Sequence, residues 1–288
     1  MNKDHRKGVV LTAIGGLALS FDIPLVKLGD GDLWSVIALR NPVTFAAGIL
    51  LWLIVRQVSG RRRPALVPGR AGMLAALCYG LSTMTFLGAV FHTATANVVF
   101  IIAFTPMFAA LLGWLVMKEV PSPSTVLTMA VMVAGVALIV SGGLQAGGLL
   151  GDFLALATSA LLAGAITIAR KTQREMGFVP LVATLLPALV GLSFVAADGF
   201  SVEAPLWIIL DGALVIPLAF WCLATGPRYL TGPEVGMFYL LETILAPVWV
   251  WMIFAEVPAM RALAGGAILV LALVAHSVWQ MRRAAAQG

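Results

Sequence analysis

Apolar residues in this chain occur in long runs, and short polar segments separate one run from the next. A run of about 20 apolar residues is long enough to cross the hydrocarbon core of a bilayer as an α-helix. We predict ten such helices, near residues 8–27, 33–57, 69–90, 93–117, 122–141, 149–170, 178–197, 203–225, 231–255 and 258–283. Because hydrocarbon offers backbone amides no partner, the predicted fold class is all-α integral membrane.

A short motif occurs twice. Lys118-Glu119-Val120-Pro121 returns 137 residues later as Ala255-Glu256-Val257-Pro258, and a tryptophan stands five residues before the glutamate in both places. We interpret the chain as two copies of one five-helix unit, residues 1–143 and 144–288. Since five is odd, the second copy has to be inverted in the membrane relative to the first. Inverted repeats are typical of transporters that work by alternating access.

Composition supports this interpretation and excludes several classes of protein. With 61% hydrophobic residues and 11% charged residues, a 288-residue chain lacks the polar surface of a soluble domain. The predicted loops are too short for a soluble catalytic or nucleic-acid-binding domain. A membrane-embedded enzyme would need a nucleophile–base pair or a metal cluster, and the three histidines and two cysteines form no such pattern. We therefore expect no enzymatic activity, no cofactor and no metal.

Positive charges fall mainly on one side of the predicted helices. With a cytoplasmic N-terminus, fifteen of the eighteen Lys and Arg residues lie in cytoplasmic segments, as the positive-inside rule requires. This distribution also explains the pI of about 9.6, so no nucleic-acid partner is expected. We predict a multi-pass protein of the bacterial inner (plasma) membrane with both termini in the cytoplasm. The alternative for residues 8–27 is a signal peptide, but removing it would leave the first copy one helix short.

Ionisable residues inside the predicted spans are costly and are therefore candidates for function. From a rise of 1.5 Å per residue, Asp22 and Arg40 both lie about 8–10 Å below the outer surface. We predict that they form an ion pair with a coupling or gating role, in which Asp211 is a third member or a rival partner. In the alternative, Asp22 and Asp211 face a wet vestibule and pair with nothing.

Glu242 is the carboxylate that we place nearest the bilayer midplane, about 16 Å from the inner end of its helix. Together with Tyr239, one turn earlier, it is suited to bind a substrate ammonium or to couple transport to protons. The alternative is a protonated glutamate that serves only structure. Aromatic candidates for the wall of a cavity are Tyr79, Phe86, Phe100, Phe104, Trp221, Phe238 and Tyr239.

Six prolines lie inside the predicted spans, where each removes a backbone donor. We expect some of them to act as hinges, and helix curvature for packing is the alternative. They are Pro24, Pro42, Pro106, Pro187, Pro217 and Pro247.

The run from Thr95-Ala96-Asn97 through Thr105-Pro106 to Lys118-Glu119 resembles the fourth-helix signature of EamA-type members of the drug/metabolite transporter superfamily. Leu241-Glu242 to Ala255-Glu256 resembles the ninth-helix version, and the resemblance covers essentially all ten helices. Within the superfamily the chain is most similar to the YddG-type aromatic amino acid exporters. The family often has a proline directly after the ninth-helix glutamate. Here Thr243 takes that place, so we expect the break one turn further on, at Pro247.

The resemblance implies a ten-helix fold with a central cavity and the export of amino acids and related metabolites. We predict a secondary-active exporter of aromatic and other neutral amino acids that works by alternating access, as a monomer or homodimer in the lipid bilayer. The alternatives are a multidrug or other metabolite exporter of the same superfamily, and less plausibly a membrane-embedded enzyme. The predicted substrate contacts are Tyr79, Asn97, Phe104, Tyr239 and Glu242.

Overall fold

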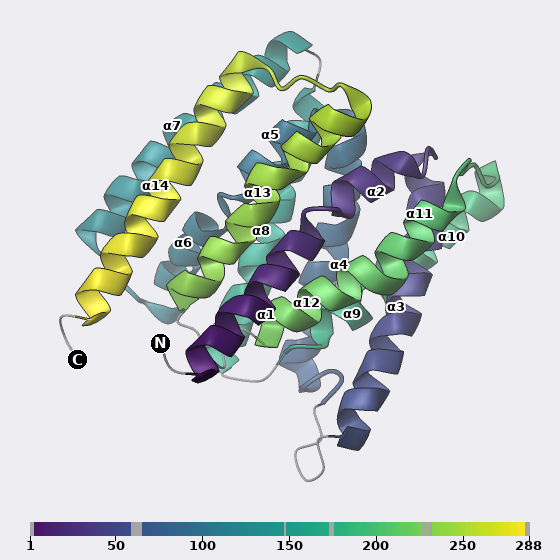
Figure 1. Cartoon of the computed structure of the whole chain (residues 1–288), viewed down its shortest axis with the longest axis horizontal. Helices are drawn as coiled ribbons and strands as arrows, with labels where there is room; N and C mark the ends of the chain where they lie inside the picture. The colour runs from purple at the N-terminus through teal and green to yellow at the C-terminus, as the bar shows by residue number, and fades with distance from the viewer. Residues whose placement is uncertain are drawn as a thin grey trace.

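The computed structural model describes residues 3–58, 65–146, 148–172, 176–225, 229 and 232–285. Within these ranges the chain is a helical bundle with one isolated β-bridge and no strand (Figure 1). The elements are α1 (Lys3–Leu19), α2 (Asp22–Leu28), α3 (Leu33–Val58), α4 (Gly69–His92), α5 (Thr95–Ile102), α6 (Thr105–Met117), α7 (Pro123–Ala146), α8 (Leu149–Thr172), α9 (Val179–Ala183), α10 (Leu185–Asp198), α11 (Pro205–Leu210), η1 (Asp211–Val215), α12 (Ile216–Thr225), α13 (Gly232–Phe254) and α14 (Met260–Ala285).

The predicted fold class is confirmed. Nine described segments are long and apolar enough to cross a membrane, and Phe238–Phe254 of α13 is a shorter apolar helix within the ninth predicted span, residues 231–255. Several spans consist of two or more consecutive helices, so there are more helical elements than spans. The loop arginines of the orientation argument at positions 61, 62, 63, 174 and 228 lie outside the described residues.

Four spans are interrupted, and a proline explains each interruption. The α-helix ends five residues before Pro24 and four residues before Pro106 and Pro187, and the π-helical turn Asp211–Val215 ends two residues before Pro217. A proline has no N–H, and its ring clashes with the carbonyl group four residues earlier. The carbonyl of Ile102, which cannot bond to Pro106, instead accepts a 2.6 Å hydrogen bond from Thr105 Oγ1. Local sequence therefore sets where these spans bend.

The expected break at Pro247 is wrong. α13 is α-helical from Gly232 to Phe254 with Pro247 inside it, and α3 likewise continues through Pro42. A helix tolerates one lost backbone hydrogen bond where neighbouring helices pack around it. Pro247 is buried, and its neighbours Ala246 and Val250 are fully buried in the core, so packing maintains the helix there.

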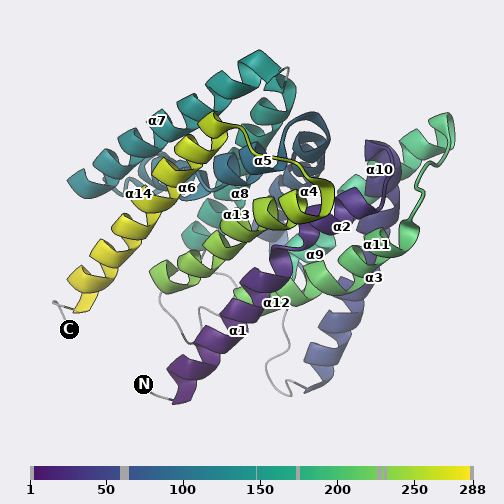
Figure 2. The same cartoon turned by 45° about the horizontal axis from the view of Figure 1, so that its top comes forward.

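Helices far apart in the sequence pack side by side. α1 packs on α12, α4 on α8, α3 on α10 and α7 on α14 (Figures 1 and 2). Both chain termini lie at one end of the bundle, which we call the terminal end; the other is the distal end (Figure 1).

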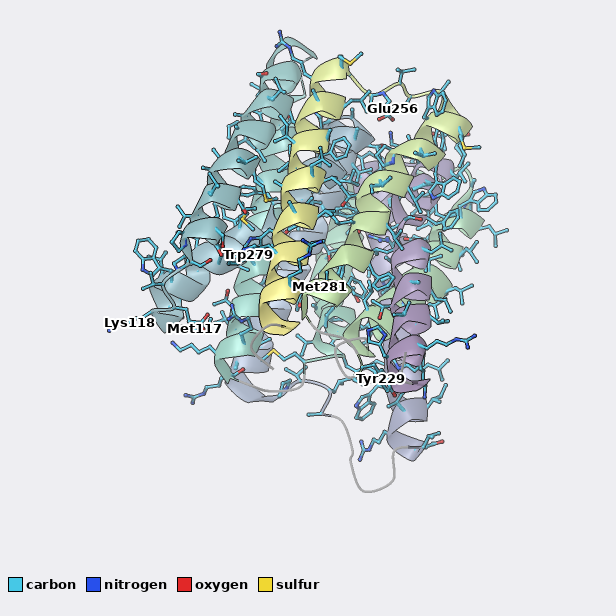
Figure 3. The ribbon with its side chains drawn as sticks, turned by 60° about the vertical axis from the view of Figure 1, so that its left-hand side comes forward. Met117, Lys118, Tyr229, Glu256, Trp279 and Met281 are labelled. Atoms are coloured by element: carbon cyan, nitrogen blue, oxygen red, sulfur yellow. The ribbon has the colours of Figure 1, made fainter. Side chains whose placement is uncertain are left out.

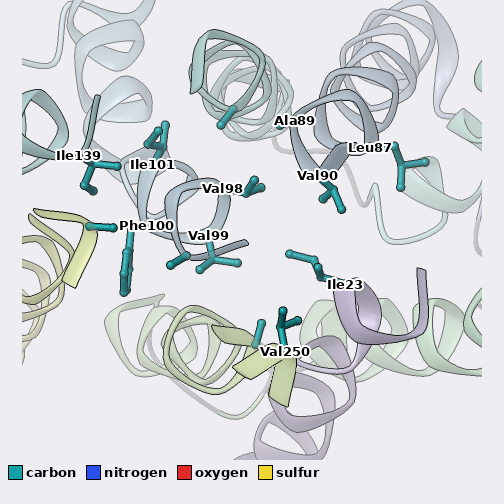
Figure 4. Close-up of a cluster of buried hydrophobic side chains, with 14 of the residues drawn as sticks. Ile23, Leu87, Ala89, Val90, Val98, Val99, Phe100, Ile101, Ile139 and Val250 are labelled. Atoms are coloured by element: carbon teal, nitrogen blue, oxygen red, sulfur yellow. The ribbon is translucent and has the colours of Figure 1, made fainter. Parts of the chain in front are cut away.

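The main hydrophobic core surrounds α5, whose Val98, Val99 and Ile101 are almost fully buried (Figure 4). Ile23 of α2 and Val250 of α13 belong to the same core. Phe100, a candidate for the cavity wall, is also buried. A Cβ at Gly266 of α14 would lie 2.4 Å from its ring, so Phe100 packs between helices.

At the distal end, two loops from different halves of the sequence are joined by backbone hydrogen bonds. Asp32 N donates to Ser201 O at 3.1 Å, and Glu203 N donates to Asp30 O at 3.0 Å. A Cβ at Gly31 would lie 2.8 Å from Ser201 O, so this close approach requires glycine.

Candidate functional site

Arg40 forms two ion pairs in the interior of the bundle. Its Nη2 donates to Asp22 Oδ1 at 2.5 Å, and its Nε donates to Asp211 Oδ2 at 2.6 Å. All three residues are buried, and none is more than 4% exposed. The predicted contact between Asp22 and Arg40 is therefore present, with Asp211 as the third member. The alternative of two unpaired aspartates in a wet vestibule is wrong.

Three irregular or closely packed backbone segments bring this triad together. Asp22 is the first residue of α2, directly after the break that separates α2 from α1. Asp211 begins η1, a π-helical turn, and such turns are frequent at functional sites. A Cβ at Gly212 would lie 2.7 Å from Arg40 O, so a glycine here lets η1 approach the backbone of α3.

The triad has more negative than positive groups. Asp211 Oδ1 is buried and accepts no hydrogen bond from any described group. A buried charge is tolerated only when it is paired and hydrogen-bonded. Two carboxylates facing one guanidinium therefore give the triad the capacity to take up one more positive charge.

Glu242 lies on α13, which packs against α1 and α2, the two helices on either side of the break that places Asp22. Its carboxyl group interacts electrostatically with Asp22 and Arg40. Tyr239, one turn earlier on α13, is within electrostatic range of both Glu242 and Tyr79 of α4. Tyr239 is 41% exposed, so neighbouring helices leave part of the residue uncovered. Two of the five predicted substrate contacts, Tyr239 and Glu242, thus lie one turn apart on a helix that packs on the segment carrying Asp22.

α13 also contacts the break between α1 and α2. Trp249 Nε1 donates to Ser20 Oγ at 3.1 Å, and the Trp249 ring stacks on Phe21 with a centroid separation of 5.2 Å. The helix that carries Glu242 is therefore linked to the segment that places Asp22.

Asn97 has a different set of partners. Its Nδ2 donates to Asp152 Oδ1 at 3.0 Å, and Thr93 Oγ1 donates to the same oxygen at 2.8 Å. Asp152 is fully buried at the start of α8. Sequence reasoning missed it because it lies three residues after the start of the predicted span, where a charge is less costly than near the midplane. Two features of the sequence could have identified it. Asp152 lies within a predicted span, and Asn97 lies at a similar distance from the end of its own span.

Phe104 lies at the break between α5 and α6 and is 8% exposed. Its ring packs edge-on against Phe108 at 5.1 Å. The contacts of Phe104 and Asn97 are with protein groups, and their predicted contact with substrate stays a prediction.

A hollow of about 590 Å³ opens at the distal end. It lies between the end of α2, the end of α4 and the end of α13, and its lining includes Lys27, Val90 and Phe254. Among the described residues, no group of three His, Cys, Asp or Glu side chains is arranged to hold a metal ion.

Comparison with known proteins agrees with this architecture. One solved structure, described only as "Crystal structure of protein", superposes with a TM-score of 0.66 at 17% sequence identity, covering 96% of this chain and 97% of its own. At that identity the similarity concerns the fold alone. No curated protein matches the sequence. Residues 6–141 match the model of the EamA-like transporter family. Over these residues, somewhat less than half of the chain, the sequence is similar to that family of membrane transporters.

Proposed function

We propose that this protein is a secondary-active exporter of amino acids, with Tyr79, Tyr239 and Glu242 as its substrate contacts. The observation that carries the proposal is the position of Tyr239 and Glu242 on α13, the helix that packs on the segment carrying Asp22 of the buried charge cluster. A carboxylate in that setting suits a substrate ammonium, and two phenol rings suit an aromatic or large apolar side chain. The Walker-type phosphate loop that ATP-driven transport needs is absent from the sequence.

The internal repeat is part of the same proposal, and the helix packing supports it. We number the ten predicted spans in chain order. In two five-helix units related by a two-fold axis, span 1 corresponds to span 6, span 2 to span 7 and so on. The α1–α12 contact joins spans 1 and 8, and the α4–α8 contact joins spans 3 and 6. The two-fold relation converts one of these contacts into the other, because span 1 maps onto span 6 and span 8 maps onto span 3. The α3–α10 and α7–α14 contacts join spans 2 with 7 and 5 with 10, so each maps onto itself.

The repeat gives the exporter its mechanism. Two inverted halves that rock about a midplane site expose it to one side of the membrane and then to the other. We propose that the triad of Asp22, Arg40 and Asp211 couples or gates this motion. It joins spans 1 and 2 of the first half to span 8 of the second half.

A second candidate substrate class is organic amines without a carboxylate. Asp22, Asp211 and Glu242 are three carboxylates, and Arg40 is the cation that we find among them. Both hydrogen-bonded nitrogens of that guanidinium face aspartates. This excess of carboxyl groups over cationic groups favours a cationic ligand, as a multidrug exporter would bind.

The membrane and the orientation are also proposals. The excess of Lys and Arg at one side of the predicted spans supports an inner-membrane protein with both termini in the cytoplasm. With that orientation the terminal end of the bundle faces the cytoplasm and the distal end faces outward.

The test is flux in liposomes that contain the purified protein. We expect saturable uptake of labelled phenylalanine, and we expect Glu242→Gln to reduce it at least tenfold, because the substrate ammonium loses its charged partner. Glu203→Gln, at an exposed carboxylate in a distal loop, is the matched control and should leave the flux unchanged.

Competition separates the two substrate classes. Phenethylamine lacks the carboxylate of phenylalanine but has the same ring and ammonium. Inhibition by neutral amino acids and not by phenethylamine supports amino acid export. Inhibition by phenethylamine alone assigns the site to amines. If folded protein transports neither compound above empty liposomes, the proposal is wrong.

A further inference from the structure

Two ion pairs at the two ends of the bundle each join the first half of the chain to the second. At the distal end, Lys27 in the last turn of α2 pairs with Glu256, which follows α13. At the terminal end, Arg170 in the last turn of α8 pairs at 2.7 Å with Glu119, which follows α6. Glu256 and Lys118, the neighbour of Glu119, lie at opposite ends of the molecule (Figure 3).

The two pairs use corresponding positions of the sequence repeat. Glu119 and Glu256 are 137 residues apart, in the duplicated motif, and Lys27 and Arg170 end the corresponding spans 1 and 6. The backbone agrees. Lys118 and Ala255, which precede the two glutamates, both have left-handed conformations, with φ of 59° and 55°. Few non-glycine residues adopt this conformation, so its presence at both positions indicates one turn used twice.

We infer that these two pairs are the gates of the transport cycle, with Lys27–Glu256 closing the distal entrance and Arg170–Glu119 closing the terminal entrance. The inference rests on the proposed alternating access of two inverted halves. Each pair bridges the halves at one end, so opening that end has to separate its two charges. Both pairs are formed in the structure.

The distal gate is the more strongly built of the two. Lys27 and Glu256 are 23% and 27% exposed, whereas Arg170 and Glu119 are 49% and 52% exposed. Glu256 also accepts a 2.8 Å hydrogen bond from Thr95 N at the start of α5. It thereby connects span 9 to spans 1 and 4. The distal hollow, which Lys27 and Phe254 line, lies directly beside this gate.

Thiol labelling in detergent tests the inference without any substrate. Cys78 and Cys222 are first replaced by alanine. A single probe is then placed at Val90→Cys, in the wall of the distal hollow, or at Thr167→Cys, about one turn before Arg170 on α8. Both positions are buried, at 6% and 3% exposed, so a slow basal reaction is expected.

Lys27→Met should raise the labelling rate at position 90 by about fivefold, the effect of losing a partly buried charged hydrogen bond, and leave position 167 unchanged. Arg170→Met should do the reverse, with a smaller increase because its pair is more exposed. Lys27→Arg and Arg170→Lys preserve the pairs and should label like the parent. In each variant, the cysteine at the other end of the bundle is the control, because a general loosening of the fold would raise the labelling rate at both probes.

Hydrogen exchange on the chain with its native cysteines is an independent measurement. Lys27→Met should speed exchange of the Thr95 amide, since that amide bonds to Glu256. Unchanged labelling and exchange in Lys27→Met, or equal increases at both probes in either variant, would overturn the inference. Because these readouts need no substrate, a failed flux assay with the expected labelling pattern rejects the substrate proposal and leaves the gates standing.

Discussion

Arg40 of α3 donates to Asp211 of the π-helical turn at 2.6 Å, and the two side chains are only 5% and 0% exposed. Since Asp22 binds a second nitrogen of the same guanidinium, one arginine joins three spans. Such a group is stabilising only while all its partners are present, because each remaining charge is costly to bury alone.

We expect Arg40→Met to lower the free energy of unfolding by about 3–5 kcal/mol, because two buried carboxylates lose their counter-charge. The triple variant Arg40→Met, Asp22→Asn, Asp211→Asn should recover most of that loss, since no unpaired charge remains. Thermal unfolding in detergent measures both variants. Equal melting temperatures for the parent and Arg40→Met would contradict this account of the triad.

Asn97→Ala separates a structural role from substrate contact. Asp152 Oδ2 is already without a partner in the described structure, and this change removes a donor from Oδ1. We expect a loss of about 1–3 kcal/mol in stability and an unchanged KM for flux. Tyr239→Phe is the comparison and should raise KM with little loss of stability. The sequence-based prediction for Asn97 is right instead if KM rises while the melting temperature holds.

Gly16→Ala tests the contact between α1 and α13. An added Cβ would lie 2.3 Å from the carbonyl oxygen of Phe238, which is backbone and cannot move aside as a side chain does. We expect a loss of about 1–3 kcal/mol, typical of overpacking. Gly164→Ala is the matched control, because its Cβ would meet only Cys78 Sγ at an ordinary 3.7 Å. A similar melting temperature for the two variants would count against close packing of α1 on α13.

Asp32 caps α3 outside the membrane-spanning segments. Its Oδ1 accepts hydrogen bonds from Trp34 N at 2.9 Å and Ser35 N at 3.0 Å. Slight burial alone would raise the pKa of the carboxyl, but hydrogen bonds from Ser35 and Trp34 outweigh it and hold the pKa below its usual value of 3.8. Asp32→Ala should cost about 1 kcal/mol of stability at neutral pH, and Asp32→Asn less.

The pH dependence of that effect has a definite sign. A carboxyl whose pKa is lower in the folded state stabilises the fold above its unfolded pKa, and the contribution disappears as the pH falls through the folded pKa. The difference in melting temperature between parent and Asp32→Ala should therefore be constant from pH 7 to pH 5 and shrink below about pH 4. A difference that grows with acidification would show that Asp32 acts in another way.

Much of the fold could be predicted from the sequence because the bilayer restricts what a chain can do. A buried backbone without water has to form helices, so long apolar runs gave the spans directly. The breaks before Pro24, Pro106 and Pro187 also follow from local chemistry, since a missing N–H acts on the nearest turn. Pro247 shows the limit of that reasoning, because tertiary packing keeps α13 continuous there.

For the candidate site, the sequence by itself determined which residues to consider, because a charge inside a span is expensive wherever it points. Depth along a helix placed Asp22 level with Arg40, but it gives no rotation about the helix axis and no contact between helices. Only the tertiary structure decided that Arg40 binds two aspartates, that Asn97 turns to Asp152, and that Lys27 meets Glu256 from the other half of the chain. Those contacts join residues up to 229 positions apart, and only helix packing determines them.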